Sequence, residues 1–438
     1  MPCSADQSLV ECDSQLPGLA TLLDDAAMLK LLQTHGWDVQ QLTSAYVRYK
    51  PYTNCLVAYE VKMDRRTTWL YGKVYPLAQL DKLAKYQRLG RRTLTSGGQP
   101  LIVEALGLAI LPFPLDRALP TVVHLLDPTT QKKLSQKLLP LGTPTAAISL
   151  KTLTYKPERR YVAQACLSQG EEQSWVVKAY TQENFTTARR NSRDVQGREV
   201  LQIAPLAGRS RHYQMLAFPW IDGQPLPERM QQTTPTALRR MLEPVGIALA
   251  ELHQQRLKRL QRVSCAAEAL DLMELVSDLC YLNPRLSPTI KTLSRRMANA
   301  LLYLPQQWQS THGDFKPDQV LVHPPRVTLI DLDRAAQGHP ARDLGSFIAQ
   351  LEYQNLRGEL PDSDRQAAVV GLLKGYDAAQ GAILSADSIR LYTALHLFKL
   401  LPEPFRYREP NWPTRMEQLL ARIQTHLQPS CSDLDWSA

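Results

Sequence analysis

The chain has 438 residues, of which 44% are hydrophobic and 21% are charged, and its formal net charge is +9 at pH 7. This length exceeds what one ordinary hydrophobic core holds, so about two or three folding units are expected. The composition excludes a disordered chain. The positive charge suits a protein that handles phosphates, but the densest basic stretches are not interleaved with aromatic residues, so no nucleic-acid partner is expected.

No stretch is apolar for long enough to cross a membrane, and the opening residues MPCSADQSLVECDSQ lack the basic and apolar regions of a signal peptide. We therefore expect a cytoplasmic protein without a membrane partner. The seven cysteines are scattered and none has a metal-binding spacing, so they are expected to be reduced.

The amino-terminal part predicts one helix followed by strands. Residues 18–34 carry leucine and alanine at helical spacing, and His35-Gly36 ends the predicted helix. Short β-branched and aromatic runs separated by polar turns then extend to Pro76, which is typical of strands.

The same strand pattern recurs about a hundred residues later. The triplet Tyr-Lys-Pro at 49–51 returns at 155–157, and Lys73 returns as Lys178 at an offset of 105. Leu-Pro-Phe-Pro at 111–114 corresponds to Leu-Ala-Phe-Pro at 216–219, again at 105. These matches predict an internal duplication, with too few copies for a solenoid.

The stretch HGDFKPDQVLVHPPRVTLIDLDRAAQGHPARDLG carries the chemistry. Two short apolar runs flank a turn, and antiparallel pairing about Pro325 would place Gln319 opposite Asp331, beside the loop that contains Asp314. A carboxylate that can accept a proton, next to an oxygen-bearing pair, is what Mg²⁺-assisted phosphoryl transfer needs.

HGD followed by five residues ending in an amide, then IDLD and RDLG, resembles the aminoglycoside phosphotransferase and choline-kinase-like family of small-molecule kinases. The resemblance implies that Asp314 is the catalytic base, that Asp331 is the principal Mg²⁺ ligand, and that Asp343 braces the catalytic loop. Gln319 stands where the family usually has a metal-binding Asn, although maltokinases, a branch of this superfamily, also carry Gln there.

Lys316 adds a second resemblance, because DFKPDQ is similar to the DLKPEN loop of protein Ser/Thr kinases, in which the lysine meets the transferred phosphate. Gly313, where protein kinases usually have Arg, matches the small-molecule kinases instead. No glycine-rich loop precedes Lys178, and residues 156–160 occupy the corresponding hairpin. This argues against both a protein kinase and a P-loop NTPase.

The second copy resembles the amino-terminal lobe of the same family. The resemblance implies that Lys178 contacts the nucleotide phosphates and that Glu199, on the helix expected to follow, is its carboxylate partner. Residues 215–226 resemble the hinge between lobes, which makes Phe218 and Trp220 candidate nucleotide contacts. Beyond the hinge, the apolar spacing of the chain predicts helices.

The predicted fold class is α+β: a bilobal protein-kinase-like fold with a β-rich amino-terminal lobe, a helical carboxy-terminal lobe, and an extra amino-terminal α+β domain resembling a duplicated lobe. The expected domains are a non-catalytic cap over 1–147, the kinase-like lobe and hinge over 148–228, and the catalytic helical lobe over 229–438. Lys73 is expected to be a relic or a surface residue, so that Lys73→Ala leaves nucleotide kinetics unchanged.

The predicted function is ATP-dependent, Mg²⁺-assisted phosphorylation of a small-molecule hydroxyl acceptor: a sugar, an aminoglycoside or an amino alcohol. A kinase-fold binding or regulatory protein, suggested by Gln319, and a protein kinase, suggested by Lys316, are the alternatives. The carboxylates at 268, 271, 274 and 278 would suit a cationic acceptor, but such a row is typical of a solvated helix face. ATP or GTP as donor and the oligomeric state stay open.

Overall fold

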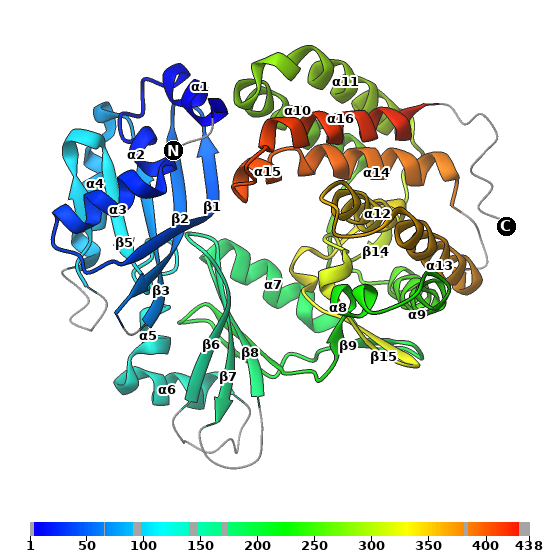
Figure 1. The fold of residues 1–438 in the computed structure, drawn as a ribbon. Helices are drawn as coiled ribbons and strands as arrows, with labels where there is room; N and C mark the ends of the chain where they lie inside the picture. Colours follow the sequence, from blue (N-terminus) through cyan, green and yellow to red (C-terminus); the bar gives the residue numbers. More distant parts are fainter. Residues whose placement is uncertain are drawn as a thin grey trace. The chain divides into compact units, whose positions relative to one another are not determined.

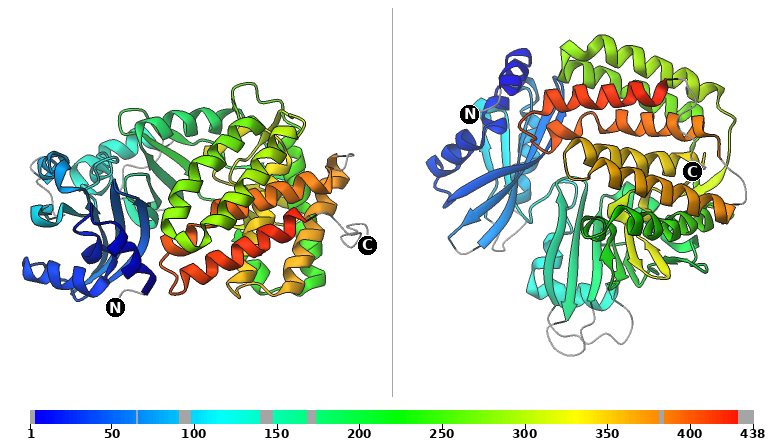
Figure 2. Two further views of the ribbon diagram at one scale, coloured as in Figure 1. Left: turned by 90° about the horizontal axis from the view of Figure 1, so that it is seen from above. Right: turned by 45° about the vertical axis from the view of Figure 1, so that its right-hand side comes forward.

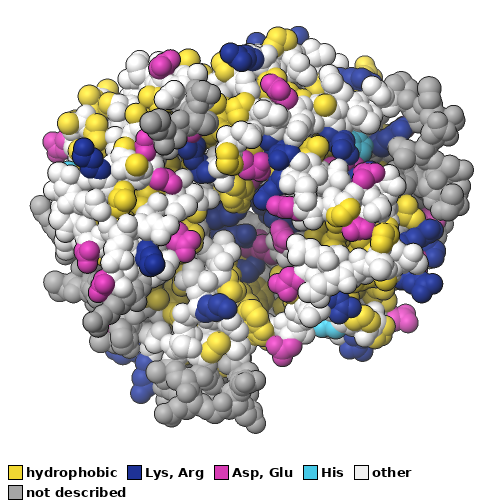
Figure 3. Space-filling model, in the orientation of Figure 1, with side chains coloured by type: hydrophobic (Ala, Val, Ile, Leu, Met, Phe, Trp, Pro, Cys, Tyr) yellow, Lys and Arg dark blue, Asp and Glu magenta, His cyan; other side chains and the backbone are white. Residues whose placement is uncertain are grey.

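The computed structural model describes residues 4–64, 66–90, 98–139, 148–167, 174–380 and 384–428. The chain forms two compact units (Figure 1). Unit 1 comprises Met1–Phe185, Leu206–Trp220 and Glu403–Pro413, and unit 2 comprises Thr186–Pro205, Ile221–Pro402 and Thr414–Ala438. No helix among the described residues has the length and apolar character needed to span a membrane. On the face drawn in Figure 3, basic and acidic side chains are both scattered over the surface.

Unit 1 contains two antiparallel five-stranded sheets with the same strand order. The first has the order β1-β2-β3-β5-β4 and the second β6-β7-β8-β11-β10, so the third strand of each lies at the centre. The strands of the first sheet are β1 (Gln41–Lys50), β2 (Asn54–Met63), β3 (Arg66–Val74), β4 (Leu101–Val103) and β5 (Leu108–Pro112). Those of the second are β6 (Ile148–Lys156), β7 (Arg160–Leu167), β8 (Ser174–Tyr180), β10 (Gly208–Ser210) and β11 (Met215–Pro219).

Helices precede each sheet and follow its third strand. The helices of the first copy are α1 (Ser4–Cys12), α2 (Leu19–Leu23), α3 (Asp25–Thr34) and α4 (Asp81–Gly90), and those of the second are α5 (Val123–Leu126), α6 (Pro128–Leu138) and α7 (Gln182–Asp194). The single helix predicted over 18–34 is in fact two helices. Asp24 is extended and its carboxylate accepts hydrogen bonds from the N–H groups of Ala26 and Ala27, which starts a new helix there.

The strand pairing confirms the duplication of the lobe. Lys73 and Lys178 both lie on the third strand, paired with Leu56 and Val162 respectively, and each first strand contains one register shift. The third sequence match is displaced, because the β4–β5 hairpin corresponds to the β10–β11 hairpin at an offset of 107 rather than 105. Phe218 therefore occupies the strand position of Leu111.

One aspartate per copy holds the turn between the first two strands. In the first copy, Asp13 Oδ2 accepts hydrogen bonds from the Tyr49 hydroxyl at 2.6 Å and the Tyr52 N–H at 3.0 Å. In the second copy, Asp116 Oδ2 accepts the equivalent hydrogen bonds from the Tyr155 hydroxyl at 2.9 Å and the Glu158 N–H at 2.8 Å. The duplicated unit thus includes the segment before each sheet. The domain boundary expected at 147 falls outside the described residues and stays a prediction.

Unit 2 is mainly helical, and three pairs of its helices lie side by side: α9 with α13, α10 with α11, and α12 with α14 (Figure 2). The closest approach is between α9 and α13. A Cβ on Gly246, Gly371 or Gly375 would lie within 2.1 Å of a backbone oxygen on the opposite helix. The helices are α8 (Leu226–Gln231), α9 (Pro235–His253), α10 (Cys265–Leu282), α11 (Ser287–Tyr303), α12 (Ala341–Leu356), α13 (Asp362–Gln380), α14 (Ala386–Leu400) and α16 (Trp412–Leu427).

Two small sheets in unit 2 position the HGD segment. One has the order β12-β15-β16-β9 and the other β13-β17-β14. Their strands are β9 (Leu201–Ile203), β12 (Gln224–Pro225), β13 (Gln261–Arg262), β14 (Gln309–Thr311), β15 (Val320–His323), β16 (Arg326–Leu329) and β17 (Ala336–Gly338). The loop between β14 and β15 therefore starts from one sheet and ends in the other.

Candidate active site

The loop after β14 is held by a buried carboxylate on α12. Asp343 Oδ2 accepts a hydrogen bond from the N–H of His312 at 2.6 Å, and Oδ1 accepts one from the N–H of Gly313 at 2.9 Å. The side chain of Asp343 is only 1% exposed. Two consecutive backbone groups bound to one fixed carboxylate set the direction in which the next residue, Asp314, leaves the loop.

His253, the last residue of α9, orients Asp343. Its Nε2 lies 3.0 Å from Asp343 Oδ2, and its Nδ1 lies 2.9 Å from the hydroxyl of Tyr376 on α13. Burial by itself raises the pKa of Asp343, but the hydrogen bond and charge of His253, with His312 and Gly313, outweigh it and lower that pKa. His253 is a positioning residue, and sequence patterns gave no sign of its partner Tyr376.

The conformation of the loop explains its first two residues. His312 Nδ1 accepts the N–H of Asp314 at 3.4 Å, so its Nε2 donates to the carbonyl oxygen of Ile330 at 2.9 Å. Gly313 has φ +80°, and a Cβ there would lie 2.0 Å from the backbone oxygen of Arg334. A larger residue at 313 would therefore push the loop away from the segment that follows Asp331.

Asp314 and Lys316 flank a buried phenylalanine. Phe315 packs on Phe347 of α12 with their ring centroids 5.0 Å apart, while Asp314 and Lys316 are half-buried. Among the described residues, neither the Asp314 carboxylate nor the Lys316 ammonium has a hydrogen-bond or ion-pair partner. An available carboxylate and an available cation lie two residues apart on a rigidly held loop, as proton abstraction and phosphate contact require.

Gln319 and Asp331 lie at the same end of the β15–β16 hairpin, but the predicted register is wrong by one residue. Val320 pairs with Leu329, and the N–H of Ile330 donates to the carbonyl of Gln319 at 3.0 Å, so Ile330 is opposite Gln319. The turn contains two residues, Pro324 and Pro325, and its centre falls between them. Asp331 follows in a left-handed conformation with φ 65° and ψ 49°.

This pair fits a magnesium ion. Gln319 is 7% exposed, and its side-chain amide makes no hydrogen bond within the described part of the chain. No group of three or more His, Cys, Asp or Glu that could hold a metal occurs among the described residues. Mg²⁺ is typically bound by one or two protein carboxylates, and phosphate oxygens and water complete its coordination shell. One carboxylate and one amide are therefore a suitable set of protein ligands.

A buried asparagine on α7 supports the segment after Asp331. Asn191 Nδ2 donates to the carbonyl oxygens of Asp333 and Ala335, both at 3.0 Å. Asn191 is fully buried. Sequence reasoning missed it, because a lone amide in a polar helix carries no pattern.

In unit 1, the second sheet brings together the three residues predicted to contact a nucleotide. Lys178 is on the central strand β8, and its Nζ lies 5.5 Å from the ring centroid of Phe218 on the neighbouring strand β11. Trp220 directly follows β11 and is 37% exposed. Its backbone N–H donates a hydrogen bond to the carbonyl oxygen of Ser174 at 2.9 Å. The cation and the Phe218 ring thus lie on two adjacent strands, and Trp220 lies directly beyond the end of β11.

Glu199 does not lie on a helix, contrary to the sequence prediction. The helix after β8 is α7, which ends at Asp194, and Glu199 is exposed in an irregular segment before β9. Gly197 interrupts the helical pattern, and the N–H groups of Val200 and Leu201 bond to the carboxylate of Glu251 on α9 instead of continuing a helix. The role of Glu199 as partner of Lys178 stays a prediction.

The carboxylates that begin at Glu268 do not form one exposed row. Glu268 is buried, its Oε2 accepts a hydrogen bond from the Tyr392 hydroxyl at 2.7 Å, and its Oε1 lies 3.2 Å from Arg342 Nε. The carboxylates at 271, 274 and 278 are exposed. Glu268 is therefore occupied by structural partners, which weakens the idea of an acidic face for a cationic acceptor.

These features define a protein of the phosphotransferase class, and comparison with known proteins agrees. Residues 165–384 match the model of APH, described as the phosphotransferase enzyme family. The chain belongs to this family. The match includes the second lobe from within β7 onward and every predicted site residue, whereas the first copy lies outside it. No curated protein matches the chain.

Several solved structures are similar at low identity. A choline/ethanolamine kinase family protein from Mesorhizobium loti is 16% identical, with 69% of this chain and 95% of that chain covered and a TM-score of 0.44. ADP-bound aminoglycoside phosphotransferase APH(2'')-Ib is 14% identical, with 69% and 100% covered and a TM-score of 0.48. Choline kinase from Cryptosporidium parvum Iowa II is 12% identical, with 68% and 95% covered and a TM-score of 0.48.

Proposed function

We propose that the chain is an ATP-dependent, Mg²⁺-assisted kinase that transfers the γ-phosphate to a hydroxyl group of a small molecule. The observation that carries this proposal is the catalytic loop. Asp343 and His253 hold its backbone, and the carboxylate of Asp314 has no partner among the described residues. A structural carboxylate would have been paired; this one is half-buried and available to a substrate.

Asp314 would accept the proton of the acceptor hydroxyl while the hydroxyl oxygen forms a bond to the γ-phosphorus. The bond from the γ-phosphorus to the bridging oxygen breaks, which yields ADP and a phosphate ester. Lys316 would contact the transferred phosphoryl group, and Lys178 the remaining phosphates. Mg²⁺, held by Asp331 and Gln319, supplies charge neutralisation of the phosphates when bound.

The alternatives make different predictions. A protein kinase usually has Arg at position 313, and here the tight approach of the Arg334 backbone excludes any side chain. A binding or regulatory protein would retain nucleotide binding without turnover. The acceptor remains a sugar, an aminoglycoside or an amino alcohol, and we expect the protein to act in the cytoplasm.

A coupled assay of ADP release tests the proposal. Purified full-length protein is given ATP or GTP, with Mg²⁺ or EDTA, and a panel of neutral sugars, aminoglycosides and amino alcohols. ADP release that requires both Mg²⁺ and an acceptor is the expected result. Nucleotide binding without turnover on any acceptor would favour the binding protein, and acceptor-independent phosphorylation of proteins would favour a protein kinase.

A further inference from the structure

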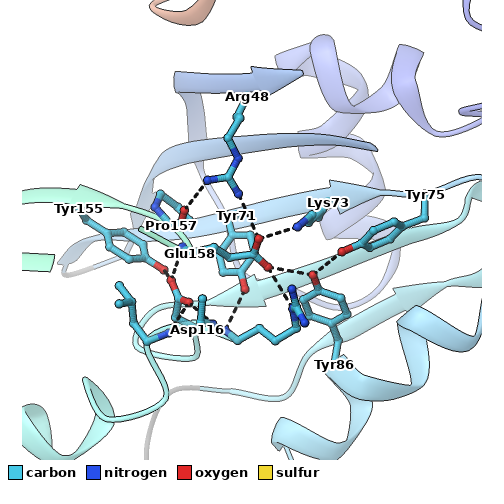
Figure 4. Close-up of polar contacts among 12 residues, drawn as sticks. Arg48, Tyr71, Lys73, Tyr75, Tyr86, Asp116, Tyr155, Pro157 and Glu158 are labelled. Atoms are coloured by element: carbon cyan, nitrogen blue, oxygen red, sulfur yellow. Dashed lines mark hydrogen bonds and ion pairs between the residues drawn. The ribbon is translucent and has the colours of Figure 1, made fainter. Parts of the chain in front are cut away.

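A carboxylate from the second copy is inserted into a basic cluster of the first copy (Figure 4). Glu158 lies in the turn between β6 and β7, and its carboxylate contacts Lys73, Arg48 and Tyr86 of the first copy. It also contacts Arg117, which follows Asp116 in the segment before the second sheet. Lys73 Nζ lies 2.5 Å and Arg48 3.0 Å from Oε2, while the Tyr86 hydroxyl lies 2.9 Å and Arg117 3.4 Å from Oε1. We call these four partners the Lys73 cluster.

The ion pair between Lys73 and Glu158 at the centre of the Lys73 cluster is buried, whereas the Arg117 side chain at its edge is 42% exposed. Lys73 is 5% exposed, and the side chain of Glu158 is also 5% exposed. Burial alone raises the pKa of Glu158, but Lys73, Arg117 and Arg48 outweigh it and lower that pKa, so the carboxylate is ionised. The expectation of a surface residue at position 73 is therefore wrong, whereas the alternative expectation that Lys73 is a relic stays untested.

This insertion is not simply inherited from the duplication. Tyr52 holds the equivalent position in the first copy, with φ 58° against 59° for Glu158, and both N–H groups donate to an aspartate. The side chain of Tyr52, however, is 54% exposed. The backbone of the turn is common to both copies, whereas the buried carboxylate belongs to the second copy alone.

The rest of the turn is held on the same side. Arg48 Nη1 lies 3.5 Å from the carbonyl oxygen of Pro157. Lys156 Nζ lies 3.1 Å from the Tyr407 hydroxyl and 5.4 Å from the ring centroid of Tyr46 on β1. Residues 156–158 of this hairpin are thus held by side chains that do not belong to its own sheet.

We propose that Glu158 is a positioning residue for nucleotide binding, and that the first copy serves to hold the 156–160 hairpin in place through it. This inference rests on the proposed function and on the sequence prediction that residues 156–160 stand where other kinases have a glycine-rich phosphate loop. The hairpin lacks the glycines whose N–H groups would grip phosphates, so its fixed position must come from elsewhere. If the loop is already ordered in the free protein, nucleotide binding does not have to supply the free energy of ordering it.

Glu158→Gln keeps the size of the side chain and removes its charge. The nucleotide KM should rise roughly tenfold, the factor that corresponds to ordering about one backbone residue, while the acceptor KM stays within twofold. Lys73→Met should have the same effect, and the exchanged pair Glu158→Lys with Lys73→Glu should recover part of the affinity. Tyr52→Gln, at the matched position of the first copy, should leave nucleotide KM unchanged.

Hydrogen exchange without nucleotide gives a readout that does not depend on activity. Amides over residues 150–162 should exchange faster in Glu158→Gln than in the wild type and in Tyr52→Gln. A folded Glu158→Gln protein with wild-type nucleotide KM and exchange would overturn the inference and leave the proposed function intact. A fall in kcat together with equal rises in the nucleotide and acceptor KM values would indicate a general structural defect and would also overturn the inference. A wild-type protein that binds no nucleotide would overturn both.

Discussion

Replacing Asp343 by asparagine removes one oxygen acceptor from the centre of the catalytic loop without changing the size of the side chain. The carboxylate now accepts from two backbone N–H groups at 2.6 and 2.9 Å and lies 3.0 Å from His253. The asparagine oxygen can serve one of these donors, and its NH₂ group would face another. At least one buried N–H group would then lose its acceptor.

The expected cost follows from these contacts. A buried donor left without an acceptor costs about 1–3 kcal/mol, and hydrogen bonds to a charged group contribute about 1.5–3 kcal/mol each. Since one such bond is lost and the contact with His253 is weakened, Asp343→Asn should lower the free energy of unfolding by about 3–5 kcal/mol, the range for breaking a buried charged pair. This is a large part of the usual 5–15 kcal/mol, so the variant should fold but be much less stable.

The same variant has a defined pH dependence. The pKa of Asp343 is lowered in the folded state, so its contribution to stability is present above the unfolded pKa of about 3.9 and is lost as pH falls through the folded pKa. The difference in unfolding free energy between wild type and Asp343→Asn should therefore be constant at neutral pH and shrink below about pH 4.

Urea unfolding at pH 7 and at lower pH measures this difference, and hydrogen exchange of the peptide over 309–316 shows whether the loop opens locally. Gln354→Glu, a polar change elsewhere on the same helix, serves as a control. An Asp343→Asn protein within about 0.5 kcal/mol of wild type, a change ordinary for a surface substitution, would refute the reasoning.

Five further substitutions test the rest of the site. Asp314→Asn should keep nucleotide affinity and lose about 10²–10⁴-fold in kcat, as removal of a general base does; turnover within a few-fold of wild type would contradict its role. Asp331→Ala should abolish Mg²⁺-dependent nucleotide binding in titrations with and without EDTA, while Gln319→Asn should retain measurable activity; the reverse pattern would show that the metal pair is wrongly assigned. Lys178→Ala should raise nucleotide KM and reduce kcat severely in steady-state assays, and an unchanged KM would remove it from the nucleotide site. Gly313→Ala should lower the thermal midpoint, because its Cβ would lie 2.0 Å from a backbone oxygen at φ +80°; an unshifted midpoint would mean that the loop can move aside.

The sequence predicted most where short-range chemistry decides the structure. The turn at Pro324-Pro325 flanked by apolar runs indicated the β15–β16 hairpin, and the repeated Tyr-Lys-Pro and strand lysine indicated the duplicated lobe. The predicted register was wrong by one residue because it was centred on Pro325, whereas the centre of a two-residue turn falls between its residues. The sequence alone did not reveal how many residues the turn contains.

Contacts between distant segments were beyond the sequence. Asn191 with Asp333, His253 with Tyr376, and Glu158 with Lys73 are pairs separated by tens to hundreds of residues along the chain. Each partner alone is an ordinary polar residue, and only the packing of several elements makes the pair buried and specific. Glu199 was misplaced for a related reason, since the carboxylate of Glu251 binds the N–H groups that a longer helix would have used.

Unit 1 includes one segment from near the end of the chain. Residues Glu403–Pro413 belong to it, and Arg408 and Trp412 donate hydrogen bonds to the carboxylate of Asp6, which is 1% exposed. Phe405 packs edge-on to Tyr49, with their ring centroids 6.3 Å apart. The first helix of the chain thus has its buried charge neutralised by residues about four hundred positions later.

During synthesis, the contacts of Asp6 with Arg408 and Trp412 can form only after these late residues have been made. Domains generally fold as they emerge, with the amino-terminal one first. Here the nascent amino-terminal half leaves the ribosome with Asp6 unpaired, and it waits for Arg408 until nearly all of unit 2 has been made. A fragment ending at Trp220 lacks these partners, and residues 1–413 are the shortest continuous stretch that contains all three segments of unit 1.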